Sequence, residues 1–167
     1  GQTRNGKITF EQYIQAAGFD SILQAANRHL LPMSDNQFQL YRQTNAVGKQ
    51  TNTFLDLEVL DISTGKRRPV GNLSGGESFK ASLSLALGLS DTIAENRGGI
   101  QMDALFVDEG FGTLDSKSLE ETKDALLSMS GENKLVGIIS HRDELMDIPQ
   151  KLRVTKGRGG SRIQMEL

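Results

Sequence analysis

The chain of 167 residues is 37% hydrophobic and 24% charged, which is the size and composition of one compact domain with a genuine hydrophobic core. Its 19 basic and 21 acidic residues give a net charge of -2, so any contact with DNA has to come from a local patch rather than from the total charge. The lack of cysteine excludes a disulfide scaffold and a thiolate metal site, and no apolar run approaches the roughly 18 residues of a membrane span, so we expect a cytoplasmic protein without a membrane partner.

The first predicted element is a helix over residues 8–31, because apolar residues recur there mostly at three- and four-residue steps. Pro32 and the turn-like Ser34-Asp35-Asn36 predict that this helix ends near Leu31. The following segment favours strands, with candidates at 38–42 and 54–62. A turn at 63–66 then predicts a hairpin whose return strand covers 67–70.

Residues 78–96 are ambiguous, since four leucines alternate with small residues as in a strand. The segment is nevertheless too long for a usual strand and contains no proline. Its apolar residues form two adjacent helical stripes. The stripes consist of Phe79, Leu83 and Leu87, and of Leu85, Leu89 and Ile93. A mostly buried helix is therefore expected.

The remaining elements alternate between strand and helix. Short apolar runs at 102–107 and 135–140 suit buried parallel strands, and an amphipathic helix is expected between them at 117–129. This alternation predicts an α/β fold with a parallel-sheet core and flanking helices. Segments 151–156 and 161–167 flank a glycine-rich turn and predict a C-terminal β-hairpin.

The first motif is Leu73-Ser74-Gly75-Gly76-Glu77, just before the long helix. Its two glycines let backbone amides approach an anion closely, and the free N–H groups and dipole of a helix N-terminus attract phosphate. Ser74 and Glu77 are also spaced as a capping box, which stabilises a helix start without any ligand. On this motif alone both interpretations stay open.

The second motif, Ala104-Leu105-Phe106-Val107-Asp108-Glu109, is an apolar strand that ends in two adjacent acids. Phosphoryl transfer uses such a pair, because one carboxylate can hold Mg²⁺, directly or through water, while the next orients the attacking water. Asp108 is the candidate magnesium ligand and Glu109 the candidate water-activating residue. Two solvent-facing acids at a strand end are the alternative, and the loop that follows counts against it.

That loop is Gly110-Phe111-Gly112-Thr113-Leu114-Asp115, and its last residue precedes a helix, so Asp115 can also be an N-cap. The next strand ends in Ser140-His141, at a strand terminus where ligands of open α/β sheets gather. His141 can there donate a hydrogen bond to a phosphate oxygen. His29, inside the first helix, is more typical of a structural histidine.

The order of these motifs resembles the signature motif, Walker B motif, D-loop and H-loop in the C-terminal half of an ABC-type ATPase head. Glu77, where transporter ATPases usually have Gln, and the run 108–115 are similar to the SbcC family of DNA-repair ATPases, with SMC proteins as near neighbours. The resemblance implies ATP and Mg²⁺ as cofactors. It also implies ATP contacts in trans by Ser74, Gly75, Gly76 and Glu77, a magnesium ligand at Asp108, catalytic residues at Glu109 and His141, and a dimer interface at Asp115.

A Walker A loop, G-x-x-x-x-G-K-[ST], is absent from this sequence, since no Gly-Lys pair is followed by Ser or Thr. In the resembled family that loop belongs to an N-terminal lobe beyond a long coiled coil. We therefore expect 1–31 to be a coiled-coil-proximal helix, 32–72 a β-rich connection and 73–167 the lobe with the four motifs. The chain alone is expected to be inactive as an ATPase.

The partners that the resemblance implies are the N-terminal lobe, a second head in a homodimer, and the nuclease subunit SbcD acting on DNA ends and hairpins. Basic residues of the C-terminal hairpin can touch DNA or can simply be a solvated edge. They are Lys151, Arg153, Lys156, Arg158 and Arg162. Two alternatives remain: an SMC-type chromosome organiser without a nuclease partner, and an interaction module with vestigial motifs.

Overall fold

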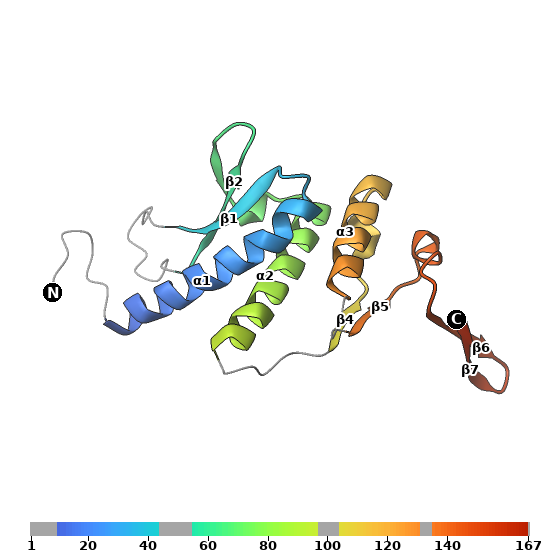
Figure 1. Ribbon diagram of the computed structural model, residues 1–167. Coiled ribbons are helices and arrows are strands. Elements are labelled where there is room, and N and C mark those ends of the chain that lie inside the picture. Colours follow the sequence, from blue (N-terminus) through green and yellow to red (C-terminus); the bar gives the residue numbers. More distant parts are fainter. Residues whose placement is uncertain (1–9, 44–54, 97–103, 131–134, 167) are drawn as a thin grey trace.

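The computed structural model describes residues 10–43, 55–96, 104–130 and 135–166, and its first element is the long helix α1, Phe10–Met33 (Figure 1). The predicted end near Leu31 is wrong, because the helix continues through Pro32. Pro32 removes only one backbone donor in the last turn, whereas Leu30 and Met33 are both buried there. The predicted start at Ile8 lies outside the described residues.

A small antiparallel sheet follows, in the order β1 (Phe38–Arg42), β2 (Leu57–Asp61) and β3 (Arg67–Pro69). The predicted strand at 38–42 is confirmed. The second and third strands are shorter than predicted, because a short 3-10 turn, η1, begins at Val70, and Phe54 lies outside the described residues. Asn27 fixes this sheet to α1: its Nδ2 donates to Leu40 O at 2.9 Å, and Leu40 N donates to its Oδ1 at 2.8 Å.

The central helix is α2, Gly75–Asn96, which lies beside α1 (Figure 1). It begins three residues earlier than the segment predicted from 78, so Gly75 and Gly76 form its first turn rather than a loop before it. The helical interpretation of this leucine-rich segment is confirmed, although Leu89 is exposed. The two helices approach closely at Gly88, where an added Cβ would lie 2.4 Å from Ala26 N.

The βαβ unit comprises β4 (Ala104–Asp108), a 3-10 turn η2 (Phe111–Thr113), α3 (Ser116–Met129) and β5 (Leu135–Ile139). The two strands pair in parallel, with Asp108 opposite Ile139, which confirms the predicted parallel pairing. Met102, included in the predicted strand, lies outside the described residues. A short turn, η3 (Asp143–Leu145), leads on to the hairpin of β6 (Lys151–Gly157) and β7 (Gly160–Glu166), which was also predicted.

Two hydrophobic clusters form the core, and α2 contributes to both. Leu83 and Leu87 pack with residues of β4, η2 and α3, whereas Ala81 packs with α1 and the antiparallel sheet. The first cluster is Met33, Leu83, Leu87, Val107, Phe111, Leu114, Leu119, Leu126 and Leu145. The second is Leu23, Leu30, Phe38, Leu40, Val59 and Ala81. The two stripes predicted for α2 thus face two different partners.

Several apolar surfaces have no cover within the described residues. On the face of the β4–β5 pair opposite the core, Phe106, Leu135 and Ile139 are more than half exposed. The hairpin, which stands away from the body in Figure 1, exposes four apolar side chains on paired positions. These are Leu152, Val154, Ile163 and Met165. Among the helices that the structure describes, none is both long and apolar enough to cross a membrane.

Candidate functional site

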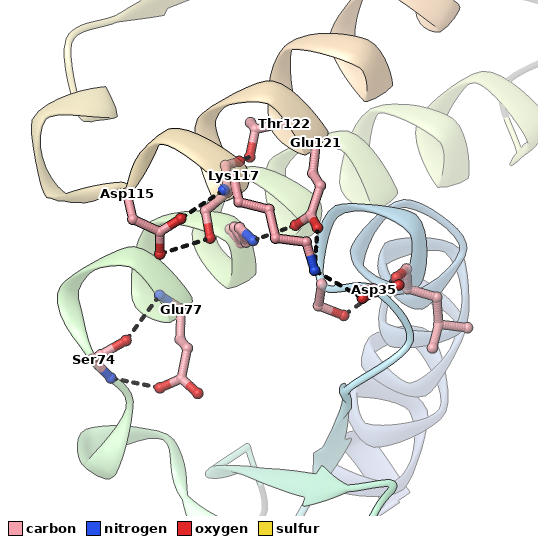
Figure 2. Close-up of polar contacts among 11 residues, drawn as sticks. Asp35, Ser74, Glu77, Asp115, Lys117, Glu121 and Thr122 are labelled. Carbon is pink, nitrogen blue, oxygen red and sulfur yellow. Dashed lines mark hydrogen bonds and ion pairs between the residues drawn. The ribbon is translucent and has the colours of Figure 1, made fainter.

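The signature segment, Leu73–Glu77, forms the capping box that its spacing allowed. Ser74 N donates to Glu77 Oε2 at 2.7 Å, and Glu77 N donates to Ser74 Oγ at 3.3 Å (Figure 2). This exchange begins α2 at Gly75 and satisfies two backbone donors of the helix start. The capping interpretation is therefore correct for the local structure, and it leaves the backbone of Gly75 and Gly76 at the exposed end of the helix.

Arg68 supports this capping box and was missed in the sequence. Its Nη2 donates to Glu77 Oε1 at 2.9 Å and its Nη1 donates to Asn72 O at 2.7 Å. Partial burial raises the pKa of Glu77, but the bonds from Ser74 and Arg68 outweigh it, so the net pKa lies below its usual value. The basic run Lys66-Arg67-Arg68 is the only signal in the sequence, and it does not indicate which residue reaches Glu77.

The signature glycines lie against the D-loop segment, Gly112–Asp115. A Cβ added at Gly75 would come within 3.2 Å of Thr113 Cβ, and one at Gly76 within 3.2 Å of Thr113 O. A hollow of about 270 Å³ opens between the two segments. Its lining includes the signature residues Ser74 to Glu77, the D-loop residues Thr113 to Asp115, and the buried Lys80. Glycine is thus needed here for packing as well as for access to the helix start.

Asp115 is the N-cap of α3, as the sequence allowed. Its Oδ1 accepts a hydrogen bond from Ser118 N at 2.8 Å (Figure 2). That bond is the main reason why the pKa of Asp115 lies below its usual value, and the charge of Lys80 acts in the same direction. The carboxylate is exposed at the rim of the hollow, so capping does not prevent it from meeting a second molecule.

The Walker B strand ends in a sharp turn. Glu109 has a φ of 59° and Gly110 a φ of 93°, so two successive residues adopt the left-handed region. This conformation is unusual for glutamate and costs roughly 1–2 kcal/mol. Glu109 N still donates to Ile139 O at 2.9 Å, which continues the ladder between β4 and β5 past Asp108. Strain of this kind concentrates at functional sites.

The turn brings Glu109 to His141. His141 Nδ1 lies 3.1 Å from Glu109 Oε2 and 3.2 Å from Oε1. The two residues are 32 positions apart in the chain and meet because parallel strands end at one edge of the sheet. Both side chains are more than half exposed, so this edge is open.

Asp108 occupies the last position of β4. Its carboxylate is exposed, and no side chain in the described ranges bonds to it. The same ranges hold no cluster of three or more metal-ligating side chains. A single free carboxylate fits Mg²⁺, which usually keeps several waters and takes one or two protein carboxylates together with substrate phosphates. The residues present therefore supply part of a magnesium site, and no complete one.

The candidate residues fall into two groups. Asp108, Glu109 and His141 lie at the carboxyl edge of β4 and β5. The signature segment and Asp115 surround the hollow at the starts of α2 and α3. His29 belongs to neither group, because its Nε2 pairs with Asp91 Oδ2 at 2.6 Å and links α1 to α2. That position agrees with the structural role expected for it.

The fold is that of an SMC-type ATPase head. A chain from a structural study of ATP-driven dimerization and DNA-stimulated activation of SMC ATPases matches with a TM-score of 0.72 and 15% identity, over 93% of this chain and 89% of that one. The Smc head domain with an extended coiled coil from Pyrococcus furiosus, bound to the C-terminal domain of ScpA, matches with a TM-score of 0.62 and 16% identity, over 93% of this chain and 37% of that chain.

Sequence comparison narrows the class further. Residues 46–127 match the family model described as SbcC/RAD50-like, Walker B motif. The SbcC subunit of the nuclease SbcCD from Staphylococcus aureus (strain MSSA476) is 43% identical over 155 residues, which is 92% of this chain. The chain belongs to the SbcC/RAD50-like family. It spans 15% of the length of that curated relative.

Proposed function

We propose that this chain is the C-terminal part of an SbcC-like ATPase head, which binds and hydrolyses ATP between two heads when combined with an N-terminal lobe. The observation that carries the proposal is the contact between Glu109 and His141, 3.1 Å apart at the end of the Walker B strand. A carboxylate beside an imidazole at the carboxyl edge of a parallel sheet suits water activation next to a bound phosphate.

The two groups of site residues act on different nucleotides in this proposal. Asp108, Glu109 and His141 serve the nucleotide held by the N-terminal lobe of the same head. Ser74, Gly75, Gly76 and Glu77 present the start of α2 to the nucleotide of the second head, where the helix dipole and free N–H groups favour phosphate. Asp115, exposed at the rim of the hollow, faces that second head.

Each residue of the first group has a separate task. Glu109 accepts a proton from, or orients, the attacking water, and His141 holds the Glu109 carboxylate and donates to a phosphate oxygen. Asp108 is the residue that would hold Mg²⁺, directly or through water. When bound, the ion neutralises charge that develops on the phosphate oxygens.

The uncovered surfaces support the presence of further segments of the head. Phe106, Leu135 and Ile139 form an exposed apolar sheet face that an N-terminal lobe would cover. At the start of α1, Phe10, Tyr13 and Ile14 are exposed at three- and four-residue spacing. This stripe suits a helix that continues into a coiled coil with a partner strand.

The name of the curated relative supports a nuclease partner, SbcD, and hence action on DNA ends and hairpins. A direct DNA contact by the hairpin is less favoured by its internal pairing. Arg153 Nε donates to Glu166 Oε1 at 2.8 Å, and Lys151 Nζ lies 3.5 Å from Glu166 Oε2. Lys156, Arg158 and Arg162 remain as candidates for phosphate contacts. Neutralising these three should reduce the salt dependence of DNA binding by the assembled complex, and an unchanged slope would argue against the contact.

An SMC-type chromosome organiser remains the second candidate, because the fold matches SMC heads. The much higher identity to the SbcC subunit of SbcCD favours the nuclease complex. Affinity purification of the full-length protein separates the two. Recovery of a metal-dependent nuclease subunit supports the first, and recovery of a ScpA-like subunit instead supports the second.

Co-expression of this chain with its N-terminal lobe tests the proposed function. We expect the assembled head to dimerise in ATP with Mg²⁺ and to remain monomeric without nucleotide, as measured by light scattering. Ser74→Arg should abolish dimerisation, because a large cation then occupies the start of α2. Ser82→Arg, an exposed position on the same helix, is the matched control and should dimerise normally. Dimerisation of the Ser74→Arg head would contradict the proposal.

A further inference from the structure

Lys80 is a buried cation within the signature-bearing helix. It lies one helical turn after Gly76, and its side chain is only 7% exposed. Burial of an ammonium group is costly unless the charge is paired. Lys80 Nζ donates to Glu121 Oε2 on α3 at 3.1 Å, so the buried charge bonds across from one helix to the next.

Glu121 is itself held from the other side. Its Oε1 lies 3.3 Å from Lys117 Nζ, and Lys117 Nζ also donates to Asp35 Oδ2 at 3.1 Å (Figure 2). Asp35 belongs to the turn that follows α1, and its φ is 51°. The chain of charges Lys80–Glu121–Lys117–Asp35 therefore joins the signature helix, the helix after the D-loop, and the end of α1.

The position of Lys80 relative to the two motifs gives this chain of charges a direction. Lys80 lines the same hollow as Ser74, Gly76, Thr113 and Asp115. Above it, Gly76 and Thr113 are in close backbone contact, so there is little freedom for one segment to shift without the other. The ion pair beneath sets the relative position of α2 and α3, from which both segments start.

We propose that Lys80 is a positioning residue for the site in trans: bonded to Glu121, it holds the signature segment and the D-loop segment as one rigid surface for the second head. This inference rests on the proposed function. Lys80 acts through Ser74 and Asp115, and it touches neither nucleotide nor water itself. An apolar side chain of similar length would fill the space but would release Glu121 from α2.

Lys123 provides a matched control. Its side chain is also 7% exposed and is paired with two carboxylates, Glu120 at 2.8 Å and Asp147 at 2.9 Å. It lies on the same helix as Glu121 but does not line the hollow. Lys80→Met and Lys123→Met thus remove the same buried charge at two places, and only one of these lies beneath the motifs.

The experiment compares the two variants in the complete protein with its N-terminal lobe. For Lys80→Met we expect ATP to bind single heads with an unchanged Kd, while ATP-dependent dimerisation weakens and kcat falls on the order of 10²-fold. Lys123→Met should match wild type in all three quantities. Glu121→Gln, which keeps Lys80 in place, should show the defect of Lys80→Met in milder form and serves if Lys80→Met fails to fold.

Equal behaviour of Lys80→Met and Lys123→Met, with dimerisation and kcat falling only in proportion to Tm, would overturn the inference, as would a normal kcat for both Lys80→Met and Glu121→Gln. Failure of the proposed function looks different. In that case wild-type heads themselves do not dimerise in ATP, and the inference about Lys80 falls with it.

Discussion

The ring of Phe79 on α2 meets the ring of Phe111 edge to face, with centroids 5.1 Å apart and planes inclined at 63°. Phe79 also fills the space beside Gly110, where an added Cβ would lie 2.2 Å from its ring. The helix that begins with the signature segment is thereby packed against the turn that follows Glu109. A change at one motif is transmitted to the other through these rings.

Gly110→Ala should destabilise the assembled head by at least about 2 kcal/mol, because alanine is strained at a φ of 93° and would clash with Phe79. Gly112→Ala is the control, since nothing lies within 4 Å of its added Cβ, and its effect should stay within about 0.5 kcal/mol. Denaturant unfolding measures both. Equal stability of the two variants would show that the Phe79 contact is not rigid.

Gly88→Ala should separate α1 from α2, because the added Cβ would lie 2.4 Å from Ala26 N and 2.7 Å from Ile22 O, and backbone atoms cannot rotate away. We expect a loss of about 1–3 kcal/mol. Gly18→Ala, in open space on α1, should instead stabilise by roughly 0.5–1 kcal/mol. Thermal unfolding of the two variants should therefore move in opposite directions, and a shift of both in one direction would refute the close crossing.

Glu109→Gln should lower kcat for ATP hydrolysis by about 10²- to 10⁴-fold, the usual value of general-base assistance, without weakening ATP-dependent dimerisation. His141→Ala should lower kcat in the same direction, because it frees the Glu109 carboxylate. Glu144→Gln removes another carboxylate just beyond the same edge, one that pairs with Arg142, and should leave kcat unchanged. A Glu109→Gln head with nearly normal turnover is the outcome that contradicts these roles.

Arg68→Met should destabilise the head by roughly 0.5–1 kcal/mol at neutral pH, where the Arg68–Glu77 pair is charged. Because the folded pKa of Glu77 lies below its unfolded value, this contribution is present above the usual glutamate range and is lost as pH falls through the folded pKa. The difference between wild type and Arg68→Met should therefore shrink in acid. Unfolding measured from neutral to acidic pH checks this, and a constant difference would exclude the ion pair as its cause.

Local spacing was enough to predict much of this chain. The capping box at Ser74 and Glu77, the N-cap at Asp115 and the strand 38–42 depend on residues near one another in sequence, and the structure has them as expected. The edge position of His141 followed from the rule that parallel strands end together.

Distant contacts were not predictable. Nothing local to Lys80 indicates that it is buried, because its partner Glu121 is 41 residues away. The continuation of α1 through Pro32 depends on the burial of Leu30 and Met33, which outweighs the local preference to stop. The close approach at Gly88 likewise depends on α1, which the sequence places no nearer than any other helix.

The central claim is that this chain carries one part of an ATPase head and needs an N-terminal lobe for turnover. Magnesium-dependent ATP hydrolysis, measured for the purified chain with and without that lobe, tests it most directly, with circular dichroism to confirm that the chain is folded in both samples. We expect no turnover by the chain alone and clear turnover once the lobe is added. Robust hydrolysis by the folded chain alone, abolished by Glu109→Gln, would contradict the account.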